Sequence, residues 1–285
     1  MKNIEITTIT GEVKRLLTKA SFNLPHDIIK AVKTAARRET CTRAREILNL
    51  IIKNAEIAGE QKLPLCQDCG SVYIDIDIGP DICIRDSGNL NNMLNQAVAD
   101  TYSSNYLRKS MVSDPLYERN NTSDNTPAVI YTAFTPDPGI GLKIYLKGGG
   151  SENCSFLHML NPSAGEDDII NLILGMIKKN VTKCCPPVII GIGLGGSASE
   201  VTRLARTATF RNLEIRNSDE RYANLENKIL DAVNETGIGP QGLGGRTTAL
   251  ACNIVYAPCH MASLPLAIFL GCHSLRRAES KISPP

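Results

Sequence analysis

The sequence predicts a single mixed α/β domain over residues 1–285, with a helical lead-in at residues 1–60 and an α/β core at residues 61–285. Two observations support this prediction. Apolar residues recur at helix spacing through the first 58 residues, and the rest of the chain mixes strand-like and helix-like stretches without a repeat or a clear linker. With 285 residues and 42% hydrophobic content, the chain is long enough to bury a sizeable core.

Each element is predicted from its apolar period and its flanking turn residues. In the lead-in, Ile29, Val32 and Ala36 share one helix face. The segment 72–78 alternates between apolar and other residues and ends at Gly79-Pro80, which indicates a half-buried strand. Further helices are predicted at 90–102, 167–178, 197–210 and 221–233. Further strands are predicted at 128–133, 141–146, 188–190, 248–256 and 264–270. Segment 108–127 is predicted to be a long loop, and the C-terminal tail is expected to be short and polar.

Composition excludes several classes of protein. The net charge is +2, so the chain has no electrostatic footprint for nucleic acid. The N-terminus lacks the apolar core of a signal peptide, and no run of about 18 apolar residues predicts a membrane span. We therefore expect a cytoplasmic protein with no nucleic-acid or membrane partner.

Three of the ten cysteines stand in settings that a plain core thiol does not need. Cys66 follows Pro64-Leu65, Cys185 directly precedes two prolines, and Cys272 stands between a glycine and a histidine. Without secretion, metal binding or catalysis explains such cysteines better than disulfides do. The three lie far apart in the chain, which excludes a local zinc finger and is compatible with a cluster held by three distant loops. With three thiolate ligands, a four-iron cluster would keep one iron open to act as a Lewis acid.

Three glycine-rich segments could bind an anion through exposed backbone N–H groups. They are residues 147–153, 191–196 and 237–248. Segment 191–196 also matches the G-x-G-x-x-G pattern of dinucleotide-binding proteins, but no apolar strand ending in an acid follows it clearly. Nicotinamide binding therefore remains an alternative, and tight turns that allow close packing are another.

Taken together, these segments resemble the class I, iron–sulfur-dependent hydro-lyases, in particular the alpha subunit of two-subunit fumarate hydratase. L-tartrate dehydratase is a close relative in that family, and residues 147–153 are more similar to its fumarase branch. The resemblance extends from about residue 10 to residue 280 and implies the fold of a class I fumarase alpha-type domain, with a cluster-bearing core. The segments that carry it are Leu65–Gly70, Lys147–Asn153, Cys185–Pro187, Gly191–Gly196, Gly237–Thr248, His260–Pro265 and Gly271–Cys272.

The resemblance implies that Cys66, Cys185 and Cys272 ligate a [4Fe–4S] cluster. Cys185 is preferred over its neighbour Cys184 because it directly precedes the two prolines, as in the family pattern. Cys69 stands where the family usually has threonine. The resulting C-x-x-C pair could be a redox motif or half of a zinc site, and Cys69 could instead be a small buried substitute for threonine.

The resemblance also implies a set of catalytic and substrate-binding residues. Asp68 would take part in proton transfer, and its alternative is an aspartate that caps a turn. His260 would be a second catalytic residue, unless it is a core histidine. The implied substrate-binding residues are Gln67, Arg108, Gly149, Gly150, Ser151 and Asn153. Arg108 would bind a carboxylate through both arms of its guanidinium group. Its position in the sequence is equally compatible with a solvated surface arginine.

The function that the resemblance implies is the reversible hydration of fumarate to malate, a reaction of the tricarboxylic acid cycle. Three alternatives remain: dehydration of tartrate or another hydroxy-dicarboxylate, a nicotinamide-binding oxidoreductase, and a non-catalytic metal-binding subunit. Fused members of the family carry a second domain, and this chain has no room for one after its core. We therefore expect a separate beta subunit, a hetero-oligomer of α2β2 type, and little activity from this chain alone.

Overall fold

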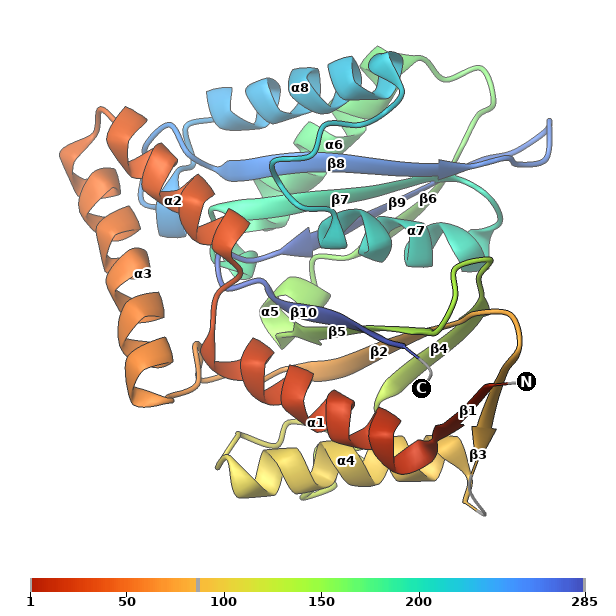
Figure 1. Cartoon of the computed structure of the whole chain (residues 1–285). Coiled ribbons are helices and arrows are strands. Elements are labelled where there is room, and N and C mark those ends of the chain that lie inside the picture. The colour runs from red at the N-terminus through yellow and green to blue at the C-terminus, as the bar shows by residue number, and fades with distance from the viewer. Residues whose placement is uncertain (1, 86–87, 284–285) are drawn as a thin grey trace. The chain divides into compact units, whose positions relative to one another are not determined.

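The computed structural model describes residues 2–85 and 88–283 and divides into two compact units. The first unit comprises residues 1–25, 55–149 and 276–285, and the second comprises residues 26–54 and 150–275. Both contain helices and a β-sheet, so the predicted mixed α/β class is confirmed (Figure 1). The prediction of a single domain over residues 1–285 stays a prediction. Pro284 and Pro285, which end the sequence, lie outside the described residues.

A four-stranded sheet in the order β10-β5-β2-β4 forms the base of the first unit. β2 is parallel to β4 and antiparallel to β5, and β10 pairs with β5 in antiparallel fashion. A small parallel pair, β1 and β3, completes the strands described in this unit. The strands are β1 (Lys2–Glu5), β2 (Ser71–Ile78), β3 (Ile82–Arg85), β4 (Val129–Phe134), β5 (Ile140–Lys147) and β10 (Arg276–Ile282).

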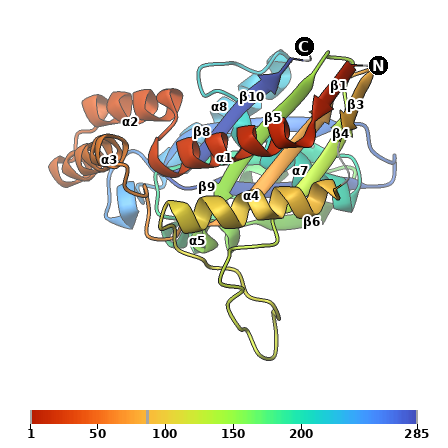
Figure 2. The same cartoon turned by 60° about the horizontal axis from the view of Figure 1, so that its bottom comes forward.

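Helices α1 (Ile6–Phe22) and α4 (Leu90–Ser104) lie across one face of this sheet (Figure 2). The face that they cover carries Ile74 of β2 and Ile144 of β5, which are fully buried and belong to one apolar core with Val13 and Leu94 of the helices. Alternate residues of a strand point to opposite faces, which is why the alternating sequence of β2 produces one apolar face. That core fixes β2 and β5, and predicted site residues lie just before β2 and just after β5.

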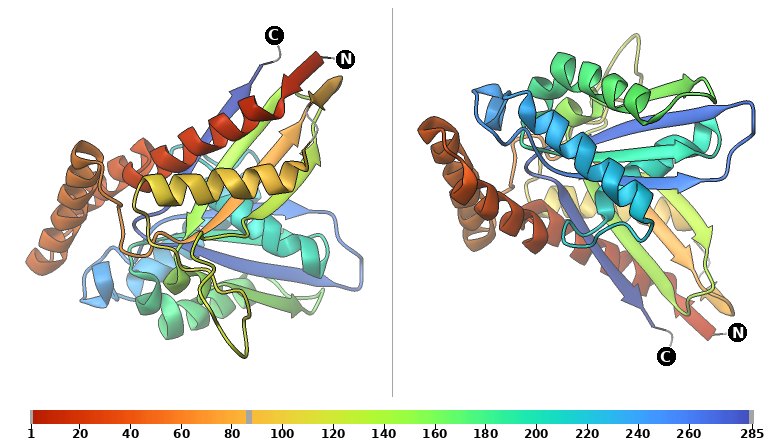
Figure 3. Two further views of the ribbon diagram at one scale, coloured as in Figure 1. Left: turned by 90° about the horizontal axis from the view of Figure 1, so that it is seen from below. Right: turned by 90° about the horizontal axis from the view of Figure 1, so that it is seen from above.

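The second unit has a sheet in the order β6-β9-β7-β8, with helices on both faces. α7 packs against β7, β8 and β9 on one face, and α6 and α8 lie side by side over the other (Figure 3, right). Only β7 and β8 are parallel to each other in this sheet. The elements are β6 (Phe156–Leu160), β7 (Val188–Gly195), β8 (Ala249–Ala257), β9 (Leu264–Gly271), α6 (Glu166–Asn180), α7 (Ala198–Phe210) and α8 (Glu220–Glu235).

The predicted helical lead-in consists of three helices that are shared between the units. α1 belongs to the first unit, whereas α2 (His26–Arg38) and most of α3 (Thr42–Gln61) belong to the second. Glu39, in the turn between α2 and α3, is buried and accepts hydrogen bonds from its neighbours Thr40 N and Cys41 N at 3.0 and 3.1 Å. None of the helices that the structure describes combines the length and the apolar character that a membrane span requires.

The predicted helices and all six predicted strands are confirmed, but four further strands were not predicted. They are β1, β3, β6 and β10. β10 reads Arg-Arg-Ala-Glu-Ser-Lys-Ile, so its composition suggests a polar tail. Pairing with β5 makes it an edge strand whose alternate residues Arg276 and Ala278 are buried. Tertiary pairing therefore overrides a weak local signal.

One alternative for the glycine segment at 191–196 is a tight turn that allows close packing, and the structure shows the close packing but a strand over most of the segment. β7 continues through Gly195. A Cβ atom on Gly191 would lie 2.3 Å from the carbonyl oxygen of Ala205, and one on Gly193 would lie 2.1 Å from that of Val201. Both glycines therefore let the backbone of α7 approach the strand closely, which is the close-packing alternative for this segment.

Replacing Gly193 by alanine is expected to destabilise the second unit by about 1–3 kcal/mol or more, because the new methyl group meets the backbone of α7 and not a movable side chain. Urea unfolding measures the loss. The matched control is Gly175→Ala in the middle of α6, where nothing lies within 4 Å of the added Cβ. That change is expected to stabilise the helix by up to about 1 kcal/mol. Equal effects of the two substitutions would contradict the packing argument.

Candidate active site

In the first unit, several predicted site residues lie at one end of the sheet. The segment Cys66–Gly70 leads directly into β2, whose first residue, Ser71, pairs with Lys147 at the end of β5. β10 begins next to this point, because Arg276 pairs with Leu146. The sheet register therefore brings together the residues before β2, after β5 and at the start of β10.

Asp68 is held by backbone groups from two of these segments. Its Oδ1 accepts a hydrogen bond from Gly70 N at 3.0 Å, and its Oδ2 accepts one from Gly149 N at 2.6 Å. Arg276 Nη1 donates to the backbone carbonyl of Asp68 at 2.7 Å, and the Arg276 side chain is almost completely buried. A Cβ on Gly148 would lie 3.0 Å from Asp68 Oδ2, so a side chain there would crowd the carboxylate. Backbone N–H groups therefore hold both oxygens of the Asp68 carboxylate in place.

Cys69 is a core residue and not a second accessible thiol. Its side chain is buried, and its Sγ accepts a hydrogen bond from Arg108 N at 3.2 Å. Burial raises the pKa of the Cys69 thiol, which disfavours the thiolate that redox or zinc chemistry requires. A threonine oxygen could accept the same hydrogen bond, which supports the reading of Cys69 as a small buried substitute for threonine.

Side chains on either side of the loop that carries Arg108 form hydrogen bonds to the backbone of the Cys66–Gly70 segment. Tyr102, at the end of α4, donates its hydroxyl proton toward the carbonyls of Cys69 and Gly70, at 3.0 and 2.9 Å. Asn125 is fully buried and its Nδ2 donates to Gly70 O at 3.1 Å. The Arg108 side chain is exposed at this anchored end of the loop, and Gln67 is exposed in the neighbouring segment.

In the second unit, Cys185 and Cys272 lie on neighbouring loops at one end of the sheet. Cys185 follows the short 3-10 helix η1 (Val181–Cys184) and precedes β7, and Cys272 follows β9. β9 ends beside the start of β7, because Gly271 pairs with Ile189. The backbone N–H of His273 donates to the carbonyl of Cys185 at 3.4 Å. Two of the three predicted cluster ligands are therefore adjacent in the fold.

Exposure and backbone conformation distinguish Cys185 from its neighbour Cys184. Cys185 is exposed and has a left-handed backbone with φ of +51°, whereas its neighbour Cys184 is buried in the core of the second unit. Cys66 and Cys272 are partly exposed, and Cys154 and Cys252 are buried. All ten cysteines lie in the described part of the chain, and none is in a disulfide there.

The glycine-rich segment after β5 spans the boundary between the units. Gly149 belongs to the first unit, and Gly150, Ser151 and Asn153 belong to the second. The short helix α5 (Gly149–Glu152) contains three of them. A Cβ on Gly150 would lie 2.6 Å from the carbonyl of Lys183, so this position also requires glycine. Ser151 is buried and Asn153 is exposed.

His260 lies at the opposite end of the second sheet from Cys185 and Cys272. It stands in the turn after β8, where its Nδ1 accepts a hydrogen bond from Ala262 N at 3.1 Å, and it is exposed. Ala257, at the end of β8, pairs with Gly195 at the far end of β7. The length of β7 separates the two ends by roughly 23 Å at about 3.3 Å per residue. The role of His260 stays a prediction, and the fold of this unit does not bring it near Cys185 or Cys272.

The nicotinamide alternative finds little support at residues 191–196. The N-terminus of α7, which would face the pyrophosphate in a dinucleotide-binding fold, is capped by the Ser197 side chain through Glu200 N. The Glu200 carboxylate lies there too, 2.8 Å from where a Cβ of Gly196 would stand. A carboxylate in this place repels phosphate.

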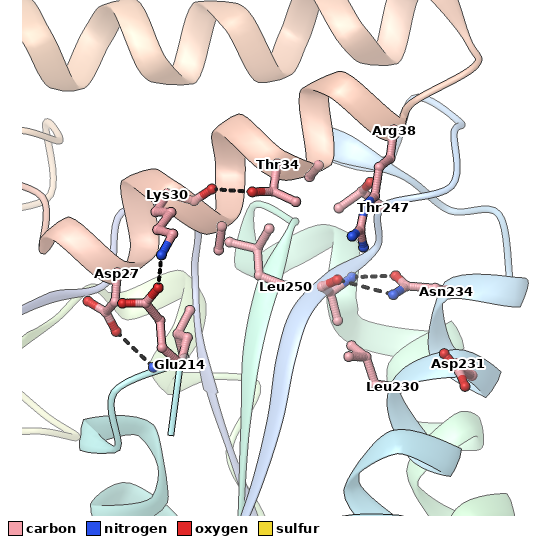
Figure 4. A pocket seen from close by; sticks show the side chains of 14 residues that line it. Asp27, Lys30, Thr34, Arg38, Glu214, Leu230, Asp231, Asn234, Thr247 and Leu250 are labelled. Carbon is pink, nitrogen blue, oxygen red and sulfur yellow. Dashed lines mark hydrogen bonds and ion pairs between the residues drawn. The ribbon is translucent and has the colours of Figure 1, made fainter. Parts of the chain in front are cut away.

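Figure 4 shows a separate cavity of about 400 Å³ in the second unit, between α2, α8 and the start of β8. Lys30 forms an ion pair with Glu214 across it, and Asp27 accepts a hydrogen bond from Leu213 N at 3.0 Å. Asn234 binds Thr248 N and Ala249 N through its side-chain oxygen. None of the predicted site residues lines this cavity, and several of its polar groups are engaged with one another.

Sequence reasoning missed three residues that support the site, namely Arg276, Gln241 and His273. The sequence marks His273 only as the neighbour of Cys272 and Gln241 only as part of a glycine-rich segment. Gln241 Nε2 donates to Pro186 O at 2.9 Å, and His273 Nδ1 lies 2.9 Å from Cys185 O. A polar residue within a glycine-rich turn is the one signal in the sequence that could have identified Gln241.

Each unit by itself holds at most two of the predicted cluster ligands, since Cys66 is in the first unit and Cys185 and Cys272 are in the second. Within residues 2–85 and 88–283, no group of three or more histidine, cysteine, aspartate or glutamate side chains is placed to hold a metal ion. Gly149–Gly150 and Leu275–Arg276 are two of the peptide bonds at which the chain passes from one unit to the other.

Comparison with known proteins identifies the family. The family described as fumarate hydratase (Fumerase) matches residues 10–281. The chain therefore belongs to this family of hydro-lyases, as one of its class I alpha-type chains. It is 37% identical over 278 residues to the putative L(+)-tartrate dehydratase subunit alpha of Methanocaldococcus jannaschii. The aligned residues cover 96% of this chain and 97% of that relative. It is 26% identical over 278 residues to the L(+)-tartrate dehydratase subunit alpha of Escherichia coli K12, covering 97% and 91% of the two chains.

Proposed function

We propose that this chain is the alpha subunit of an iron–sulfur hydro-lyase that removes water from a hydroxy-dicarboxylate. The observation that carries the proposal is the adjacency of the Cys185 and Cys272 loops, where His273 N donates to Cys185 O. These accessible thiols suit a cluster, because iron–sulfur centres are bound by cysteine thiolates. Cys66, Cys185 and Cys272 would hold a [4Fe–4S] cluster. When bound, it supplies Lewis-acid polarisation of the substrate's C–O bond.

Asp68 is the proposed proton-transfer residue. In a dehydration, a base takes a proton from the carbon next to one carboxylate, and the hydroxyl group leaves the neighbouring carbon as hydroxide, which takes up a proton to become water. The Asp68 carboxylate is oriented by Gly70 N and Gly149 N, and each oxygen retains a lone pair that can accept a proton. An oriented carboxylate beside a predicted ligand loop suits a general base.

The remaining residues would bind the two carboxylates of the substrate. Arg108 offers an exposed guanidinium beside the anchored end of its loop, and Gln67 offers an exposed amide. Gly149 and Gly150 would allow close approach to the backbone, and Ser151 and Asn153 would add polar side chains. His260 keeps its predicted catalytic role only as a hypothesis, because it lies at the other end of the second sheet.

Tartrate is the better-supported substrate. The sequence suggested fumarate first and tartrate as the alternative, but the relatives reported above are named L(+)-tartrate dehydratase subunit alpha. We therefore propose L(+)-tartrate or a similar hydroxy-dicarboxylate as the substrate. Fumarate hydration is the second candidate, because the matching family is described as fumarate hydratase.

The proposed partner is a separate beta subunit, in a hetero-oligomer of α2β2 type. The relatives are named alpha subunits, which supports a second kind of chain. The beta subunit would supply further groups that position the substrate. Turnover by this chain alone is therefore expected to be at least about 100-fold lower than that of the complex, because misplaced substrate reacts slowly.

Anaerobic reconstitution with iron and sulfide tests this proposal. The expected result is a cluster signal in optical and EPR spectra that substrate perturbs, with turnover of L(+)-tartrate only when the beta subunit is present. Malate and fumarate are titrated in parallel, and a stronger response to them would favour the second candidate. A chain that takes up no iron, with or without its partner, contradicts the proposal. Tight binding of a nicotinamide cofactor without iron would favour the oxidoreductase alternative.

A further inference from the structure

Two residues, Gln241 and His273, bind the backbone of the Cys185 loop in the second unit, and we call this pair the clamp. Gln241 lies in the short 3-10 helix η2 (Pro240–Gly242) and binds Pro186 O twice, through its backbone N at 2.8 Å and its Nε2 at 2.9 Å. His273 binds Cys185 O twice, through its backbone N at 3.4 Å and its Nδ1 at 2.9 Å. Two successive carbonyl groups are thus gripped from two different loops.

The two residues of the clamp are neighbours in the fold. Gln241 Nε2 lies 3.2 Å from His273 Nδ1, so the two side chains are in contact. Since Nδ1 donates its proton to Cys185 O, this contact is not a second hydrogen bond of Nδ1. The peptide group that joins Cys272 to His273 supplies one of the bonds to Cys185 O. The clamp therefore connects the backbone of one predicted ligand to that of another without using either thiol.

The conformation of the clamped loop needs this support. Cys185 and Gln241 have φ values of +51° and +55°, in the left-handed region that residues other than glycine rarely adopt. Such conformations persist where the surrounding structure determines them. The Gln241 loop is in turn fixed to the scaffold, because the buried Glu39 accepts a hydrogen bond from Arg246 N at 2.9 Å.

We propose that Gln241 and His273 are positioning residues that hold the Cys185 and Cys272 loops together, so that both thiols are placed for one metal centre before it binds. This inference rests on the proposed function for the identity of that centre. The placement of the two thiols does not depend on the proposed function, because it can be measured in the metal-free chain.

The test uses Gln241→Asn in the full-length chain. Asparagine tolerates the left-handed backbone but is too short to reach both Pro186 O and His273. In the reduced, metal-free chain, dibromobimane links thiols that lie close together, and mass spectrometry identifies the linked pair. We expect a Cys185–Cys272 product in the wild-type chain and a several-fold lower yield in the variant. In the reconstituted protein, iron loss to a chelator is expected to be about 10- to 100-fold faster, as for other groups that orient metal ligands.

Conservative variants separate positioning from general folding. His273→Asn can place an amide nitrogen near the position of Nδ1, so it is expected to restore much of the cross-linking, whereas His273→Leu is not. Gln241→Gly keeps the left-handed backbone without the side chain and is expected to match Gln241→Asn. Gln96→Asn makes the same chemical change at an exposed position of α4 and is expected to alter neither measurement.

The outcomes distinguish this inference from the proposed function. Equal cross-linking yields in the wild-type chain, Gln241→Asn and Gln241→Gly overturn the clamp, whether or not iron binds. A lower yield in the variants together with no iron uptake by the wild-type chain supports the clamp and contradicts the cluster.

Discussion

Replacing Cys185 by serine is expected to abolish the cluster and lower turnover by at least about 100-fold, more than the loss seen for groups that merely orient a ligand. The ligand to iron is a thiolate, and a serine hydroxyl does not ionise at neutral pH. Cys185 is exposed at the start of β7, beside the Cys272 loop, so its loss removes one of two adjacent predicted ligands. Iron and sulfide content, EPR spectra and turnover of the reconstituted complex measure the effect.

The matched control is Cys184→Ser, one residue away. Cys184 is 1% exposed and belongs to the apolar core of the second unit. A hydroxyl group in this place is expected to cost about 1–3 kcal/mol of stability while leaving the cluster intact. If Cys184→Ser loses the cluster and Cys185→Ser keeps it, the assignment of the ligand is wrong. Cys66→Ser and Cys272→Ser are expected to behave as Cys185→Ser does.

Replacing Asp68 by asparagine is expected to lower kcat by about 10²- to 10⁴-fold, the contribution typical of a positioned acid or base. The cluster should remain, because Asp68 is not one of the proposed ligands. Asparagine keeps only one acceptor oxygen for Gly70 N and Gly149 N, so a local loss of stability of about 1 kcal/mol is expected as well. Iron content and single-turnover kinetics separate the chemical effect from the structural one.

Asp77→Asn is the control for this change in the same unit. Asp77 is on β2 and forms a part-exposed ion pair with Lys143 at 3.3 Å, so its loss is expected to cost no more than about 1 kcal/mol and to leave kcat unchanged. Full activity of Asp68→Asn with an intact cluster would remove Asp68 from the mechanism. Asp68→Glu keeps the charge but shifts it, and an intermediate kcat is expected.

The alternation of β2 and the helix spacing of the lead-in are strong local signals, and both were predicted correctly. β10 was missed because its sequence is polar and its pairing with β5 joins residues far apart in the chain. The strand predicted at 188–190 was too short, because the sequence contains no sign that a helix backbone packs against the glycines that follow. Local patterns report local structure, whereas these features depend on distant segments.

The sequence by itself determined the mixed α/β class, the order of most elements and the family resemblance, because these depend on residue types at short or ordered spacings. Through that resemblance it also favoured Cys185 over Cys184 as the predicted ligand, because two prolines follow Cys185. Only the tertiary structure showed that the Cys185 and Cys272 loops are adjacent and that Gln241 joins them. It also placed Arg276 against Asp68, and His260 at the other end of its sheet. The physical reason is that strand pairing and register decide which loops meet, and these connect residues far apart in the sequence.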